Sequence, residues 1–278
     1  MGYRSPMPAD SIRYFRLPVT GIDAMNASTA RAFPRHTHDL YGIGRVEAGG
    51  HASWSGRGKV EAGPGTYITT NPGEVHDGMA VGGTPRSWRI LYFEPGALGA
   101  LLADVNEGAG REYEFSAPVF DDGALREVFD RAFSFATADA RAGAEAALAC
   151  ESALLVLAAR LRGHGDGARA RPGIAAPVVT RARARIDADP AAPHALTTLA
   201  RDCGVSRFQL MRGFARATGL TPHAYIVQQR LALARRLIRA GGDLAQVALD
   251  AGFCDQSHLA RCFTRQFGVP PRRYAAAG

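Results

Sequence analysis

The sequence has little cysteine, almost no lysine and no long apolar run. Its four cysteines, Cys150, Cys203, Cys254 and Cys262, lack the paired spacing of a structural zinc site. We expect Cys203 and Cys254 to be buried structural thiols, with a redox switch as the alternative. It has no apolar run of about 18 residues and no basic start followed by an apolar segment. We therefore expect no membrane span, no signal peptide and a cytoplasmic location. Lysine occurs once, at Lys59, so arginine supplies almost all of the positive charge.

The positive charge is concentrated in the C-terminal part of the chain. From Ile174 onward there are 15 arginines and six acidic residues, whereas the part before it has 18 basic and 20 acidic residues. A local excess of arginine is expected of a segment that neutralises DNA phosphates. The charge distribution therefore favours a nucleic-acid partner for this part.

The same C-terminal part contains an internal repeat at an offset of 49 residues. The matching pairs are Leu210/Leu259, Arg212/Arg261, Phe214/Phe263, Arg216/Arg265, Gly219/Gly268, Pro222/Pro271 and Tyr225/Tyr274. In each copy an apolar helical stripe precedes a glycine, Gly204 or Gly252, and Ser206 or Asp255 can then cap a second helix. The pattern predicts two helix-turn-helix units, each placing its second helix for DNA reading.

A helical projection predicts which side chains of the second helices are exposed. With Leu210 or Leu259 in the core and about 100° per residue, both outward faces carry two arginines at matching positions. The outward residues are Phe208, Arg212, Ala215 and Arg216 in the first copy, and Ser257, Arg261, Thr264 and Arg265 in the second. A helix from Pro222 to about Ala240, roughly 27 Å long, joins the copies and approaches one DNA turn of about 34 Å. The alternative is that these are ordinary solvated arginines on amphipathic helices.

The front part of the chain has a β-rich texture. Glycine and proline breaks separate short apolar runs, which predicts strands at Tyr41–Ala48, His51–Ser55, Gly58–Ala62, Tyr67–Thr70 and Trp88–Phe93. Helical patterns follow at Asp122–Phe135 and Gly143–Leu161. We therefore predict an α+β chain of two domains. They are a sensor domain at 1–162, with a β-barrel at about 32–95 and helices at about 122–162, and an all-α DNA-binding domain at 174–278 after a linker at 163–173.

The C-terminal motif "AGFCDQSHLARCFTRQFGVPPRRY" resembles the signature of the AraC/XylS family of bacterial transcription regulators. The resemblance implies recognition helices that begin near Ser206 and Asp255, with promoter DNA and RNA polymerase as partners. The resemblance and the projection together nominate as DNA-contacting residues Arg207, Phe208, Met211, Arg212, Arg216, Gln256, Ser257, His258, Arg261 and Arg265. Phe208 and Met211 are apolar where many family members are polar, which suits contact with thymine methyl groups.

The segments "FPRHTHDLYGIGRVEAGGHASWSGRG" and "EAGPGTYITTNPGEVHDG" resemble the cupin-like sensor domain often fused to such DNA-binding domains. In that arrangement His36, His38 and His76 can converge, and three imidazoles can bind a divalent metal. Enzymatic cupins commonly carry a glutamate four or five residues after the second histidine, where this chain has Gly42 and Ile43. We therefore expect structural or ligand-lining histidines, no metal cofactor and no catalytic residues, with metal binding as the alternative.

A barrel with apolar walls and a few polar groups can hold a small-molecule effector. The candidate lining residues are His36, His38, Tyr41, Arg45, Trp54, His76, Trp88 and Tyr92, of which about half must face outward because side chains alternate along a strand. The helices after the barrel either pack on the sheet alone or form a homodimer near Leu148, Leu155 and Val156.

These observations predict a ligand-responsive, sequence-specific transcription regulator that acts as an activator. One alternative is a metal-dependent cupin enzyme with an accessory DNA-binding domain. Another is an architectural protein that binds DNA through charge alone, and it predicts strong salt dependence with little preference among sequences.

Overall fold

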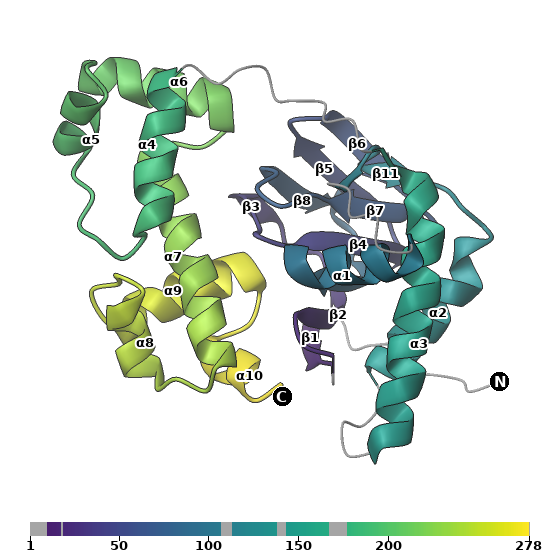
Figure 1. Ribbon diagram of the computed structural model, residues 1–278. Helices are drawn as coiled ribbons and strands as arrows, with labels where there is room; N and C mark the ends of the chain where they lie inside the picture. Colours follow the sequence, from purple (N-terminus) through teal and green to yellow (C-terminus); the bar gives the residue numbers. More distant parts are fainter. Residues whose placement is uncertain (1–9, 18, 107–112, 138–142, 167–176, 278) are drawn as a thin grey trace. The chain divides into compact units, whose positions relative to one another are not determined.

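The computed structural model describes residues 10–17, 19–106, 113–137, 143–166 and 177–277 (Figure 1). By its internal contacts the chain divides into two compact units. The first comprises Met1–Ala32, Asp39–Arg169 and the last two residues, and the second comprises Phe33–His38 and Ala170–Ala276. The predicted linker at 163–173 lies partly outside the described residues. None of the described helices is both long and apolar enough to cross a membrane.

The first unit is built on antiparallel strand pairs. Its larger sheet has the order β1-β2-β9-β4-β7-β11, formed by Ser11–Arg16 (β1), Ile22–Thr29 (β2), Arg86–Phe93 (β9), Tyr41–Ala48 (β4), Tyr67–Thr70 (β7) and Val119–Phe120 (β11). The smaller sheet of this unit has the order β8-β5-β6, formed by His76–Ala80 (β8), His51–Ser55 (β5) and Gly58–Ala62 (β6). A short pair joins Glu114–Phe115 (β10) and Gly165–Asp166 (β12). Strand β3 (Phe33–His36) belongs to the second unit. The five predicted strands are confirmed, and β1, β2, β3, β8, β10, β11 and β12 were not predicted.

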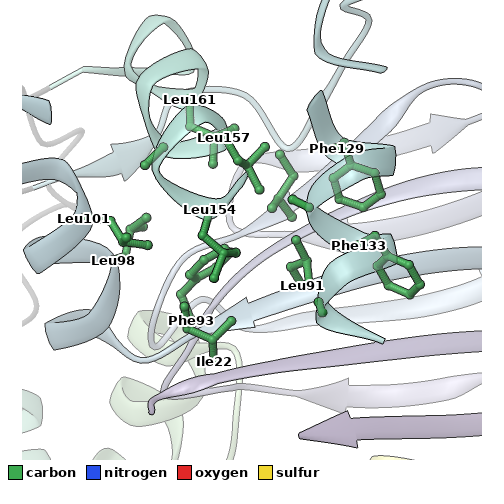
Figure 2. Close-up of a cluster of buried hydrophobic side chains, with 14 of the residues drawn as sticks. Ile22, Leu91, Phe93, Leu98, Leu101, Phe129, Phe133, Leu154, Leu157 and Leu161 are labelled. Atoms are coloured by element: carbon green, nitrogen blue, oxygen red, sulfur yellow. The ribbon is translucent and has the colours of Figure 1, made fainter. Parts of the chain in front are cut away.

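Helices α1 (Pro95–Val105), α2 (Leu125–Ala136) and α3 (Gly143–Leu161) cover one face of the six-stranded sheet. The cluster in Figure 2 joins Leu91 and Phe93 of β9 to Phe129 and Phe133 of α2, and Leu154, Leu157 and Leu161 of α3 complete it. Because side chains alternate along a strand, Arg86, Trp88, Ile90 and Tyr92 of β9 project from the opposite face.

That opposite face is turned toward the smaller sheet. The Nε of Arg86 on β9 donates a hydrogen bond to Nδ1 of His51 on β5, over 2.9 Å. The rings of His51 and Trp88 pack edge to face with centroids 6.0 Å apart. His76 and Gly78 of β8 lie on the same face of the smaller sheet as His51, because Ser55 pairs with His76 and His51 pairs with Ala80. We call the space that these side chains face the barrel interior.

The second unit is helical, with two helix-turn-helix pairs around a central helix. Its helices are Pro177–Ala188 (α4), Leu196–Asp202 (α5), Arg207–Thr218 (α6), Pro222–Arg239 (α7), Leu244–Asp250 (α8), Gln256–Phe267 (α9) and Pro271–Ala275 (α10). Helix α5 contacts α6, α8 contacts α9, and α7 contacts both α6 and α9 (Figure 1). The predicted tandem arrangement is therefore confirmed.

The sequence repeat produces a repeated core. Phe214 of α6 packs against Tyr225 of α7 with ring centroids 5.4 Å apart and an interplanar angle of 66°. Phe263 of α9 packs against Tyr274 of α10 with values of 5.3 Å and 65°. Leu210 and Leu259 are fully buried beneath these pairs, as are both phenylalanines. The same residues at the same spacing therefore anchor both second helices in the same way.

Candidate nucleic-acid interface and barrel interior

Helix α6 begins at a capping box. The Oγ of Ser206 accepts a hydrogen bond from the backbone N–H of Gln209 over 3.2 Å, and the Ser206 N–H donates to Oε1 of Gln209 over 2.9 Å. Gly204 precedes this cap at φ +69°, a left-handed conformation that glycine adopts without a Cβ penalty. The turn and the cap together fix where α6 starts and which side chains its first turn presents.

The outward face of α6 combines positive charge with apolar surface. Arg207, Arg212 and Arg216 are exposed. Phe208 and Met211 are 67% and 42% exposed, although both are large apolar residues. The guanidinium of Arg212 lies over the Phe208 ring, 5.4 Å from its centroid, so one side chain restrains the other. Exposed apolar groups beside arginines suit contact with thymine methyl groups and nearby phosphates.

Helix α9 presents a more polar face. Asp255 caps it by accepting a hydrogen bond from the backbone N–H of His258 over 2.7 Å. Gln256, Ser257, Arg261 and Arg265 are exposed. The projection predicted this for the last three, whereas Thr264, also predicted outward, is half-buried. His258 is half-buried because its ring packs edge to face against Phe253, with centroids 5.2 Å apart. It therefore offers less free surface than its predicted neighbours.

Most of the arginines on these faces pair with no acidic side chain of the described residues. Among the described residues, no ion pair involves Arg207, Arg212, Arg216 or Arg261. Elsewhere in the same unit, Arg185 and Arg201 both pair with Asp202. Guanidinium groups that lack an internal partner keep their hydrogen-bond donors for phosphates or base edges.

Three of the predicted effector-lining residues face the barrel interior, namely His76, Trp88 and Tyr92. Trp88 is 5% exposed and contacts His51 across the interior. The Nδ1 of His76 is 3.1 Å from the carbonyl oxygen of Glu74, and burial lowers the pKa of His76 to about 4. Its imidazole is therefore neutral at pH 7 and adds no charge to the interior.

Tyr41 and Arg45 do not line the interior, because they project from the other face of β4. The hydroxyl of Tyr41 donates to the carbonyl oxygen of Tyr113, on the helical side of the sheet. Arg45 forms an ion pair of 2.8 Å with Asp130 of α2, which also pairs with Arg89. The alternation of β4 was predicted, but the side of the sheet that the helices cover was not.

Trp54 does not line the interior either. It is 54% exposed, and its strand partner Lys59 lies on the outer face with it. His51, three residues earlier on β5, faces the interior instead. The prediction that Trp54 lines the interior is therefore wrong.

His36 and His38 interact with each other. Nδ1 of His36 is 2.7 Å from the carbonyl oxygen of Pro34, so it carries the hydrogen. Nε2 of His36 then accepts from Nε2 of His38, 3.1 Å away. His36 and His38 belong to the second unit and His76 to the first, so we assign no site to the three.

Sequence reasoning missed Arg86 and His51, the two groups that hydrogen-bond across the barrel interior. A signal for Arg86 existed, because it is two residues before Trp88 and therefore on the same face of a strand. The predicted strand began at Trp88, whereas β9 begins at Arg86. His51 was placed on a predicted strand, but the face that it occupies was not.

Comparison with known proteins identifies both units. The profile described as "AraC-like ligand binding domain" matches residues 19–158, about half of the chain, and the one described as "Helix-turn-helix domain" matches residues 199–277. The chain belongs to the AraC family. It is therefore a DNA-binding transcription regulator that carries a ligand-binding domain.

Two relatives of this AraC-family chain differ in how much they share with it. The uncharacterised regulator YbfI of Bacillus subtilis is 25% identical over 229 residues, which are 82% of this chain and 81% of YbfI. The regulator MtrA of Neisseria gonorrhoeae is 39% identical over 75 residues, 27% of this chain and 25% of MtrA. The chain therefore spans only about a quarter of MtrA.

The fold also resembles that of a solved structure. Wild-type ToxT of Vibrio cholerae, solved with a bound unsaturated fatty acid, superimposes with a TM-score of 0.57 and 12% identity. The match covers 94% of this chain and 97% of ToxT. At this identity the likeness shows the fold alone.

Proposed function

We propose that this AraC-family chain is a transcription activator whose two reading helices, α6 and α9, bind promoter DNA when a small molecule occupies the barrel interior. The observation that carries the proposal is the pair of matched helix faces with exposed arginines. Four of these arginines, Arg207, Arg212, Arg216 and Arg261, form no ion pair with the described residues. On promoter DNA the bound protein contacts RNA polymerase. The relatives named as transcriptional regulators support this reading.

Regulation requires the effector to bind two states of the protein with different affinity. An effector that strengthens promoter binding tenfold must itself bind the DNA-bound state tenfold more tightly, a coupling free energy of about 1.4 kcal/mol. The same coupling then makes promoter DNA tighten effector binding by an equal factor. This reciprocity gives an independent measurement of the mechanism.

A footprint on the protein's promoter DNA, with and without candidate metabolites, tests the proposal. We expect protection of two adjacent short boxes and a change in affinity when an effector binds. A footprint that no barrel-binding metabolite alters would refute the coupling. Protection without sequence preference at any salt concentration would instead favour the architectural alternative.

We propose further that the chain is not an enzyme and needs no metal. The rival reading, a metal-dependent cupin enzyme, predicts a stoichiometric divalent metal in the purified protein. It also predicts that His76→Ala loses this metal. Elemental analysis of parent and variant decides between the two readings, since a folded, metal-free parent that binds promoter DNA contradicts the enzyme reading.

We also propose a homodimer formed through α3. Leu148 and Val156 are 64% and 53% exposed, and they lie eight residues apart, on the same face of the helix. Exposed apolar residues at this spacing suit helix pairing. Two copies on DNA would also extend the recognised site.

A further inference from the structure

Arg86 is a buried cation without an acidic partner. Its side chain is 1% exposed, and it donates from Nε to Nδ1 of His51 over 2.9 Å and from Nη1 to the carbonyl oxygen of Arg31 over 3.2 Å. Its Nη2 is buried and has no hydrogen-bond partner. Within the described ranges, no carboxylate forms an ion pair with it. An uncompensated charge and an unmade hydrogen bond are both costly in a protein interior.

His51 adds a second hydrogen-bond donor and no charge. Its Nδ1 accepts from Arg86, so in the neutral ring the hydrogen is on Nε2. Burial, together with Arg86 and His76, lowers the pKa of His51 to about 3, so the ring is neutral at pH 7. Burial lowers the pKa of Arg86 only to about 10, so the guanidinium stays charged. The pair therefore presents one positive charge and two donors.

Gly78 leaves the point between these donors without a side chain. A Cβ added to Gly78 would be 3.5 Å from Nη2 of Arg86 and 3.8 Å from Nε2 of His51. Its nearest neighbour outside the adjoining residues would be Cε1 of His51, at 3.4 Å. This point is one covalent bond from Cα of Gly78, so a ligand oxygen must lie beyond it, toward the two nitrogens. Because Gly78 has no side chain, no Cβ of this residue blocks an oxyanion that accepts from both.

The surroundings of this position are apolar and aromatic. The guanidinium of Arg86 lies over the Trp88 ring, 4.9 Å from its centroid. Ile90 follows on the same face of β9, and both it and Trp88 are 5% exposed. His51 and His76 are half-buried. A ligand here needs an anionic head and an apolar body.

We propose that the barrel interior binds the carboxylate of a small organic acid, with Nη2 of Arg86 and Nε2 of His51 donating to its two oxygens. Trp88 and Ile90 contact its aromatic or aliphatic part. The carboxylate supplies the negative charge that Arg86 lacks. This inference rests on the proposed sensing of a small molecule by the first unit, and it names the chemical class of that molecule.

Fluorescence titration of the full-length chain tests the inference. The chain has two tryptophans, so Trp54→Phe leaves Trp88 as the only reporter. The probes are benzoate, phenylacetate and hexanoate at pH 7, each against its uncharged amide, with inorganic phosphate and chloride as anion controls. We expect at least one acid to change the Trp88 emission saturably, and its amide to bind at least tenfold more weakly.

Two variants test the two parts of the site. Arg86→Gln removes the charge, and Gly78→Ala fills the oxygen position. The added methyl group makes only ordinary contacts, so the fold is retained. Each should weaken binding by roughly tenfold to a hundredfold, as expected for lost charge-assisted hydrogen bonds. Gly63→Ala, a change of the same size with no atom within 4 Å, should leave the affinity unchanged.

Any of four results overturns the inference. They are that no acid binds saturably, that acid and amide bind equally, that phosphate or chloride binds as tightly as the acid, or that Gly78→Ala binds like the parent. Gly78→Ala decides the matter even if Arg86→Gln does not fold. Footprinting the same preparations on promoter DNA distinguishes a failure of the carboxylate assignment from a failure of the proposed function. If promoter binding persists and responds to an uncharged metabolite, only the carboxylate assignment fails.

Discussion

Replacing Arg212 or Arg261 by alanine should weaken binding to the promoter site by about 1–3 kcal/mol each, which is about five- to 150-fold. Both guanidinium groups lie on the outward faces of reading helices, and among the described side chains neither pairs with an acid. A well-placed arginine that contacts a base edge contributes discrimination of this size. If the arginine contacts only a phosphate, its loss weakens binding to all sequences equally.

The structure also bounds the effect of these changes on stability. Arg261 is exposed and loses no ion pair, so its removal should change the free energy of unfolding by no more than about 0.5 kcal/mol. Arg212 also loses its contact with the Phe208 ring, worth about 0.5–1 kcal/mol at an exposed site. A loss of DNA affinity larger than these values therefore cannot come from unfolding.

Fluorescence anisotropy with a labelled promoter duplex and a scrambled duplex, at several salt concentrations, measures the effect. Arg273→Ala is the matched control, because it removes an exposed arginine of the same unit from α10. Base reading is refuted if both duplexes lose affinity equally and the salt slope falls by about one for each variant. Equal losses in the Arg273 control would show that only the overall charge of the unit matters.

Three further outcomes are expected. Ser206→Ala breaks the capping box of α6 and should lower the free energy of unfolding by about 0.5–2 kcal/mol in urea titrations, and no change would mean that the cap is dispensable. Folding holds the pKa of His51 near 3 and that of His76 near 4, so the unfolded chain binds more protons below pH 6.5. The free energy of unfolding should therefore fall as the pH drops from 6.5 toward 4. His51→Gln should flatten this pH dependence, and an unchanged slope in the variant would contradict the role of His51. Leu148→Glu with Val156→Glu should convert a dimer to a monomer in light scattering without lowering the melting temperature, and a monomeric parent would refute pairing through α3.

The helical part of the molecule was predictable because its signals are local. The projection starts from Leu210 or Leu259 in the core, where both are found, and the repeat allowed the same prediction of outward residues twice. The barrel was less predictable, since both faces of β9 are covered, one by helices and the other by the smaller sheet. Hydrophobicity then cannot tell the two sides apart, which is why Arg45 was assigned to the interior. Arg86 was missed because the predicted strand began two residues too late, at Trp88. Which face the helices cover depends on contacts between distant segments.

The two reading helices share one buried anchor and differ in what they expose. Helix α6 shows Phe208 and Met211 beside its arginines, whereas α9 shows Gln256 and Ser257. A single chain that reads DNA with these two faces therefore requires a site with unlike halves. The site of one copy is therefore not palindromic, so each bound copy has a fixed direction along the promoter, and inverting its site turns that copy relative to the start of transcription.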